Sequence, residues 1–405
     1  MKILMLSSLY LPLLGGIATS VRSLVSELSK RGHEVIICTV RQRDLPAYEE
    51  QDGAKVYRLD GLFQKIPFLF RDPARKWHPP ARDWLITRNL APIIEREKPD
   101  IIHAHDWILY SALPLRRKFN IPLILHLRGT GFLCPMTTSL TSKNTVCDEP
   151  VTRRCISCTS DFYGLARALA AYYGIKTNKD KLKLIDRFIA VSSFVKEFHL
   201  KHLGLADNDI VVVPNFYAAD RDKAKAEELP EDFILFAGWL KPHKGVDVLI
   251  EAYQKLDTDT KLVLIGLEDP AYHYKGTETI LIIKNLPHDA VMQAMSRCRF
   301  AVFPSVFPEP FANVGIEAMS QRKAVIAAAT GGLKDVVVDG ETGLLVPPDN
   351  ADKLAEAISY LLERPQLASE MGERGYQRFI KNYTPDVVVP MIIDVYQSLI
   401  LGEKS

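Results

Sequence analysis

The stretch CRFAVFPSVFPEPFANVGIEAM, residues 298–319, passes from a short apolar strand through a loop into a helix. We expect the strand to end near Ser305 and the helix to begin near Phe311, because Pro310 suits a helix entry. The first backbone amides of a helix have no partner within it and can bind an anion. Here these amides belong to Ala312, Asn313 and Val314.

Two carboxylates, Glu309 and Glu317, flank that helix start with seven residues between them. A carboxylate can accept hydrogen bonds from two neighbouring hydroxyls, so it suits a vicinal diol. Two of them beside a phosphate-binding helix end suit a ligand with a diol on each side of a phosphate, such as a nucleotide sugar. The spacing alone is more typical of a helix-start charge followed by a solvated helix residue.

Similar strands recur along the whole chain and alternate with helical patterns. Continuously apolar strands separated by helices indicate parallel sheets that are covered on both faces. A polar stretch without an apolar face, residues 217–232, divides the chain into two halves, and 405 residues are too many for one ordinary core. The sequence therefore predicts an α/β protein with two doubly wound domains that face each other across a cleft. The strands read PDIIHAH, IPLILHL, DRFIAVS, DIVVVPN, FILFAGW, TKLVLIG, TILIIKN, CRFAVFPS and KAVIAAA.

The N-terminal stretch MKILMLSSLYLPLLGGIATS is similar to a signal peptide. We favour another interpretation: a buried strand over Lys2–Ser8, a turn at Gly15 and Gly16, and a helix over Ile17–Arg31. The two glycines would let the backbone approach a ligand closely. On this interpretation the chain has no leader, and we expect a cytoplasmic protein.

The two halves of the chain differ in charge. Residues 1–215 hold 31 Lys+Arg against 21 Asp+Glu, which gives +10, whereas residues 216–405 hold 20 against 28, which gives −8. The first half could face a phosphorylated acceptor or an anionic membrane surface, or its charges could simply be solvated. Residues 61–90 mix aromatic and basic side chains, which suits a peripheral contact at the inner face of a membrane or a helix packed on the first domain.

The segment 304–348 resembles, almost position by position, the nucleotide-sugar motif of the retaining family 4 glycosyltransferases. GWLKPHKGVDVLIEAY at 238–253, the opening YLPLLGGIATSVRSL, DRFIAVSS and VVVPN also fit, so the resemblance covers nearly the whole chain. It implies the GT-B fold, with an acceptor-side domain over 1–214 on which 385–405 packs back. It also implies a nucleotide-sugar domain over 215–384.

The resemblance implies roles for single residues. Glu317 would bind the ribose hydroxyls of the donor, and Glu309 would contact the donor sugar and take part in catalysis. Lys244 would neutralise the pyrophosphate. Backbone along the sugar and phosphates would come from Phe311, Ala312, Asn313 and Val314, with Gly15 and Gly16 at the same end.

The chain departs from the family at Trp239, where an arginine usually accompanies the lysine of the phosphate site. Trp239 either stacks on the ligand or packs against the loop. On the first domain, His126 ends a strand and is similar to the family's active-site histidine, which orients the reaction. His105 and Asp106 end the preceding strand and are weaker candidates.

Four cysteines, Cys134, Cys147, Cys155 and Cys158, lie within 25 residues and end in a C-x-x-C pair. They could bind structural zinc, bind an iron–sulfur cluster, form two disulfides or stay free as thiols. We expect a structural role in shaping an acceptor loop.

The resemblance thus implies a hexosyltransferase that works with retention of anomeric configuration, and we expect no catalytic metal, because Lys244 and the helix amides supply the positive charge. Its donor would be a UDP- or GDP-linked sugar, and its acceptor a saccharide or a lipid-linked saccharide. We expect no nucleic acid as partner. The alternatives are a nucleotide-sugar epimerase of the same fold and a non-catalytic protein that binds nucleotide sugars.

Overall fold

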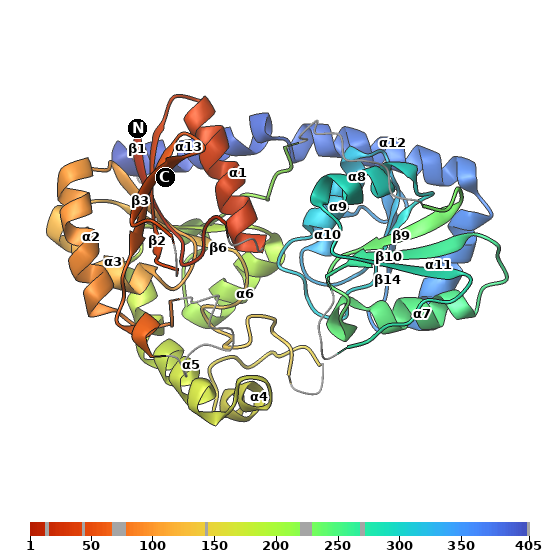
Figure 1. The fold of residues 1–405 in the computed structure, drawn as a ribbon, viewed down its shortest axis with the longest axis horizontal. Helices are drawn as coiled ribbons and strands as arrows, with labels where there is room; N and C mark the ends of the chain where they lie inside the picture. Colours follow the sequence, from red (N-terminus) through yellow and green to blue (C-terminus); the bar gives the residue numbers. More distant parts are fainter. Residues whose placement is uncertain are drawn as a thin grey trace. The chain divides into compact units, whose positions relative to one another are not determined.

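The computed structural model describes residues 1–12, 16–42, 45–66, 78–141, 145–218, 229–267 and 272–402. The chain divides into two compact units (Figure 1). The first unit contains residues 1–143, 147–213 and 388–405, and the second contains residues 144–146 and 214–387. The main division after residue 213 lies one residue before the expected boundary, and the C-terminal return begins at 388 where the sequence suggested 385.

The first unit is built on an eight-stranded sheet with the order β3-β4-β2-β1-β5-β6-β7-β8. All neighbouring strands are parallel except β3 and β4, which form an antiparallel hairpin. The strands are β1 (Lys2–Leu6), β2 (Glu34–Val40), β3 (Tyr48–Gln51), β4 (Ala54–Leu59), β5 (Ile101–Ala104), β6 (Leu123–Leu127), β7 (Arg187–Ala190) and β8 (Ile210–Val212).

Helices connect these strands and flank the sheet (Figure 1). The first helix, α1 (Gly16–Lys30), buries Val21, Leu24, Val25 and Leu28 along one face, as its apolar repeat predicts. The strand and the helix predicted for the N-terminus are therefore confirmed, whereas the predicted turn lies partly outside the described residues. The other helices of this unit are α2 (Trp84–Glu97), α3 (Leu109–Phe119), α4 (Arg154–Tyr163), α5 (Leu165–Asn178), α6 (Ser193–Leu203) and most of α13 (Pro385–Ile400).

The second unit has a six-stranded, fully parallel sheet with the order β11-β10-β9-β12-β13-β14. Its strands are β9 (Phe233–Ala237), β10 (Lys261–Gly266), β11 (Ile280–Lys284), β12 (Ala301–Phe303), β13 (Val325–Ala328) and β14 (Gly343–Val346). Its helices are α7 (Val246–Gln254), α8 (His288–Arg297), α9 (Asn313–Ser320), α10 (Leu333–Val336), α11 (Ala351–Leu362) and α12 (Pro365–Asn382).

Each parallel sheet reverses its strand order at one position. In the first unit the reversal lies between β1 and β5, and in the second it lies between β9 and β12. In open α/β sheets, ligands bind outside the carboxyl ends of the strands at this position. The loops that follow β9 and β12 therefore mark the expected ligand site of the second unit, and those that follow β1 and β5 mark that of the first.

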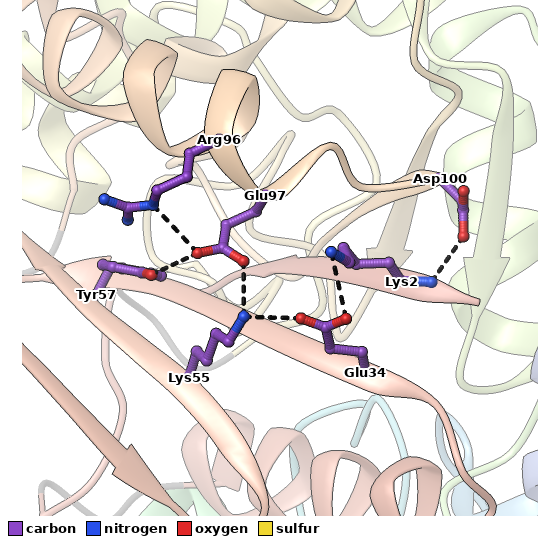
Figure 2. A network of polar contacts seen from close by, with 7 residues as sticks. All are labelled: Lys2, Glu34, Lys55, Tyr57, Arg96, Glu97 and Asp100. Carbon is purple, nitrogen blue, oxygen red and sulfur yellow. Dashed lines mark hydrogen bonds and ion pairs between the residues drawn. The ribbon is translucent and has the colours of Figure 1, made fainter.

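The amino-terminal ends of β1, β2 and β4 carry a network of charged side chains (Figure 2). Glu97, at the end of α2, accepts hydrogen bonds from Lys55 Nζ at 2.9 Å and from the Tyr57 hydroxyl at 2.6 Å. Arg96 Nε lies 3.3 Å from the same carboxylate, and Lys55 also contacts Glu34 at 2.8 Å. Burial alone would raise the pKa of Glu97, but these partners outweigh it and lower the pKa to about 2.

In the described part of the chain, no helix is both long and apolar enough to cross a bilayer.

Candidate active site

Two loops meet at the reversal point of the second sheet. Gly245, in the loop after β9, has φ of +78°, and a Cβ atom there would lie 1.9 Å from the carbonyl oxygen of Pro304. The amide of Val306 donates a hydrogen bond to the carbonyl of His243 at 3.0 Å. Glycine at 245 is therefore required for the two loops to approach each other, and the backbone hydrogen bond fixes their alignment.

Glu309 and Lys244 come together across these loops. Oε1 of Glu309 lies 2.6 Å from Lys244 Nζ and accepts a hydrogen bond from Ser305 Oγ at 2.7 Å. The side chains of Glu309 and Lys244 are 12% and 23% exposed. Lys244 Nζ also lies 4.7 Å from the centre of the Phe307 ring. The carboxylate and the ammonium are thus oriented in advance and still accessible to a ligand.

The loop after β13 holds the backbone of Glu309. Gly332 donates its amide hydrogen to the Glu309 carbonyl at 2.7 Å. Gly331 has φ of +53°, and a Cβ atom there would lie 2.3 Å from that same carbonyl oxygen. The two consecutive glycines allow this close contact, so three loops together determine where Glu309 lies.

Helix α9 begins at Asn313, two residues later than the sequence suggested. Phe311 and Ala312 are buried, at 8% and 3% exposure, and the Phe311 ring packs edge-on against Tyr383. Phe311 and Ala312 thus belong to the buried end of the loop, and the helix begins after them. Ala312 provides no side-chain cap, so the amides that follow it remain oriented outward from the helix start.

Glu317 lies one turn into α9 and is 14% exposed. Its Oε1 atom lies 3.0 Å from Nε2 of His288, the first residue of α8. The His288 ring also contacts Tyr217 edge-on, with 5.9 Å between ring centres. Both glutamates of the motif therefore have a basic partner from another part of the second unit. Sequence analysis named Lys244 only for the phosphate site and did not single out His288.

Trp239 follows β9 and is 39% exposed. Lys241 Nζ lies 4.6 Å from the centre of its ring, a cation–π contact. Lys241 and Lys244 belong to the same turn, because the Lys244 amide donates to the Lys241 carbonyl at 3.0 Å. The Trp239 ring thus contacts the ammonium group of Lys241, which lies three residues before Lys244 in the same turn.

The candidates on the first unit differ in exposure: Gly16 is exposed, Asp106 is partly buried, and His105 and His126 are buried. Gly15 lies outside the described residues, and Gly16 is the first residue of α1, where an added Cβ atom would meet no other atom within 4 Å. Asp106 accepts hydrogen bonds from the amide and hydroxyl of Ser8 and from the amide of Ile108. These contacts give Asp106 a structural role, joining the end of β1 to the start of α3.

His126 lies on β6 and is 1% exposed. Its ring stacks on His103, with 5.3 Å between ring centres, and on His105, at 5.5 Å. Arg128 Nη2 lies 3.5 Å from Nδ1 of His105. Burial, together with the charge of Arg128, holds the pKa of all three histidines well below the usual value. Burial also lowers the pKa of Arg128 to about 9.

His103 and Arg128 were not singled out from the sequence, although a signal was present. Residues two apart on a strand point to the same face, so His103 accompanies His105, and Arg128 accompanies His126.

All six cysteines are described, and none of them forms a disulfide. Cys134 and Cys155 are buried, and Cys147 and Cys158 are partly buried. Burial raises the pKa of Cys134 to about 11. No three of the four clustered sulfur atoms lie within 4.8 Å of one another. This arrangement is not the closed tetrahedron of a structural zinc site, and metal binding by the four cysteines stays a prediction.

Comparison with known proteins identifies the family. The sequence profile of Glycosyltransferase Family 4 matches residues 14–221, about half of the chain, and that of Glycosyl transferases group 1 matches residues 219–378. The chain belongs to glycosyltransferase family 4, and its two parallel α/β units form the GT-B fold.

Relatives and solved structures align with the chain from end to end. An uncharacterized glycosyltransferase of Methanocaldococcus jannaschii is 29% identical over 98% of this chain and 99% of its own. Glycogen synthase of Mycobacterium tuberculosis is 24% identical over 100% of this chain and 96% of its own. Sucrose-phosphate synthase from Thermosynechococcus elongatus has a TM-score of 0.74 at 20% identity, covering 99% of this chain and 100% of that one. Anabaena HepE, solved in complex with UDP, has a TM-score of 0.68 at 17% identity, covering 98% and 100%.

Proposed function

We propose that this protein transfers a hexose-type sugar from a nucleotide-diphosphate sugar to a saccharide or lipid-linked acceptor, with retention of anomeric configuration. The observation that carries the proposal is the pair of accessible carboxylates, Glu309 and Glu317, on either side of the start of α9 at the reversal point of the sheet. Lys244, in contact with Glu309, adds a cation at the same place.

In this proposal each group contacts one part of the donor. Glu317 accepts the two ribose hydroxyls, and His288, 3.0 Å from it, keeps its carboxylate oriented before the donor binds. Lys244 and the outward amides at the start of α9 stabilise the diphosphate, whose charge grows as it leaves. Glu309 contacts hydroxyls of the transferred sugar.

The leaving phosphate would help to deprotonate the incoming acceptor hydroxyl on the same face of the sugar. His126 would orient the sugar from the first unit. No side chain is assigned as a nucleophile.

The contact between Trp239 and Lys241 bears on the non-catalytic alternative. The family's usual arginine is missing at 239, but Lys241 brings an ammonium group to the turn that contains Lys244. We propose that Lys241 supplies the second positive charge of the phosphate site, which favours a functional transferase.

The test is a thermal-shift panel with UDP, GDP, ADP, CMP and dTDP on the wild type and on Glu317→Ala. A nucleotide at 100 times its dissociation constant stabilises the fold by about 2.7 kcal/mol. Removing the diol acceptor should weaken binding by about 1–3 kcal/mol. Glu356→Ala is the matched control, because that glutamate is 63% exposed on α11, where it pairs with Lys353 of the same helix.

A shift with one nucleotide that is lost in Glu317→Ala and kept in Glu356→Ala supports the donor site and identifies the base. An equal shift in all three proteins would place the nucleotide elsewhere, and no shift with any nucleotide would count against the proposal. NMR of the anomeric proton in the donor and the product then tests retention.

A further inference from the structure

Three histidines converge inside the first unit. One nitrogen atom from each of His103, His105 and His126 lies within 4.8 Å of the other two, and each side chain is at most 1% exposed. We call these three residues the histidine cluster. His103 lies on β5, His105 follows that strand, and His126 lies on the neighbouring strand β6. The cluster therefore has a rigid frame, because both strands belong to the interior of the sheet.

The imidazole nitrogens of the cluster are incompletely paired. Nε2 of His103, Nε2 of His105 and both ring nitrogens of His126 are buried without a hydrogen-bond partner. Leaving a buried polar atom unpaired is costly, so such a group requires an explanation. Four such atoms in one place indicate that something else satisfies them.

We infer that the histidine cluster binds a divalent first-row transition metal ion such as Zn²⁺. Neutral imidazole is a preferred ligand of zinc, copper, iron and nickel, and three histidines are a complete protein ligand set when a fourth position stays open. Imidazole binds a metal ion in its neutral form.

A contact outside the cluster supports this assignment. The hydroxyl of Tyr396, on α13, lies 2.7 Å from Nδ1 of His103. This hydrogen bond fixes the ring and occupies Nδ1, and Nε2 of His103 has no hydrogen-bond partner. Ligating histidines typically have such a partner on their other nitrogen.

Arg128 opposes the binding of a metal ion at the histidine cluster. A guanidinium can only donate, so Nδ1 of His105 accepts from Arg128 and the proton of His105 stands on Nε2. Metal binding through Nε2 thus requires Arg128 to release the ring, and the positive charge of Arg128 repels the ion. The separation of 3.5 Å is at the long end for a hydrogen bond, so this contact is weak. We expect Arg128→Gln to bind the ion at least about tenfold more tightly.

The experiment is a titration of the full chain, freed of metal by chelation, with Co²⁺ followed by visible spectroscopy and with Zn²⁺ followed by calorimetry. We expect one ion per chain and ligand-field bands without the intense near-ultraviolet band of a cobalt–thiolate bond. That band distinguishes the histidine cluster from the four cysteines, and Cys155→Ser is expected to bind as the wild type does.

Variants locate the site. His103→Gln and His105→Gln are expected to lose stoichiometric binding. His199→Gln is expected to keep it, because His199 is also buried in the first unit but bonds to the Val195 carbonyl, away from the cluster. Circular dichroism of each variant establishes that it is folded, and the wild type and Arg128→Gln test the inference without any loss of a histidine.

Absence of stoichiometric binding in both the wild type and Arg128→Gln overturns the inference. Binding that survives in His103→Gln and His105→Gln, or that disappears in Cys155→Ser, also overturns it. These readouts do not depend on nucleotide binding, so they stand whatever the outcome of the nucleotide panel.

Discussion

Glutamine in place of Glu97 should destabilise the first unit in a pH-dependent way. A pKa lowered from 4.5 to about 2 corresponds to roughly 3 kcal/mol at 1.36 kcal/mol per unit. Water screens much of this, because the partner side chains Lys55 and Arg96 are 33% and 61% exposed. We therefore expect Glu97→Gln to lower the free energy of unfolding by about 1–2 kcal/mol at pH 7.

The sign of the pH dependence follows from the lowered pKa. Above the ordinary pKa of 4.5, Glu97 is ionised in both the folded and the unfolded chain, and its full contribution is present. As the pH falls below 4.5, the unfolded chain takes up the proton first, so the contribution declines and is lost near pH 2. The difference between wild type and Glu97→Gln should be smaller at about pH 3.5 than at about pH 7.

Urea denaturation followed by circular dichroism measures this difference at the two pH values. Glu34→Gln is the matched control, because Glu34 contacts the same Lys55 but is 43% exposed, so its loss should cost less than about 1 kcal/mol. Equal losses in the two variants, or a Glu97→Gln difference that does not change with pH, would refute the reasoning.

Three further substitutions test the loops and one helix cap. Gly245→Ala should destabilise the second unit by more than about 2 kcal/mol in urea denaturation, because its Cβ would clash with the Pro304 carbonyl. Gly340→Ala, with φ of +73° and no neighbour within 4 Å, should lose only about 1 kcal/mol, and similar losses would contradict the clash. Lys244→Met should weaken calorimetric binding of the nucleoside diphosphate that the panel identifies and leave binding of its nucleoside unchanged; equal weakening of both would remove Lys244 from the phosphate. Asp83→Ala should cost about 1–2 kcal/mol in thermal unfolding, because Asp83 caps α2 through the amides of Leu85 and Ile86, and an unchanged melting temperature would contradict that role.

Much of the fold could be predicted because the central strands of both sheets are buried on both faces. Such strands are continuously apolar and easily recognised, and the nine strands predicted from apolar runs between residues 101 and 328 are all present. The hairpin of β3 and β4 was missed because its strands, YEEQ and AKVYRL, contain charged residues and are not continuously apolar. Its turn was readable, since Asp52-Gly53 is a preferred hairpin dipeptide and both residues have positive φ.

The candidate site was predictable where residues are close in sequence and obscure where they are not. Glu309, Glu317 and the start of α9 lie within one stretch, and the structure places them as the spacing suggested, apart from the later helix start. His288 contacts Glu317 although 29 positions separate them in the sequence, and no local sequence pattern predicts such a contact. The burial of His126 was also not predicted, because its ring lies against His103 and His105 from the neighbouring strand and the residue after it.

The C-terminal segment has a consequence for how the protein is made. The second unit is almost continuous in sequence, over 214–387, so it can fold as soon as that stretch has left the ribosome. The first unit begins at residue 1 but lacks residues 388–405, including the Tyr396 hydroxyl that bonds to His103, until translation has passed the entire second unit. The first unit therefore cannot complete its contacts with α13 until the second unit has been synthesised, and we expect the unit that is synthesised first to finish folding last.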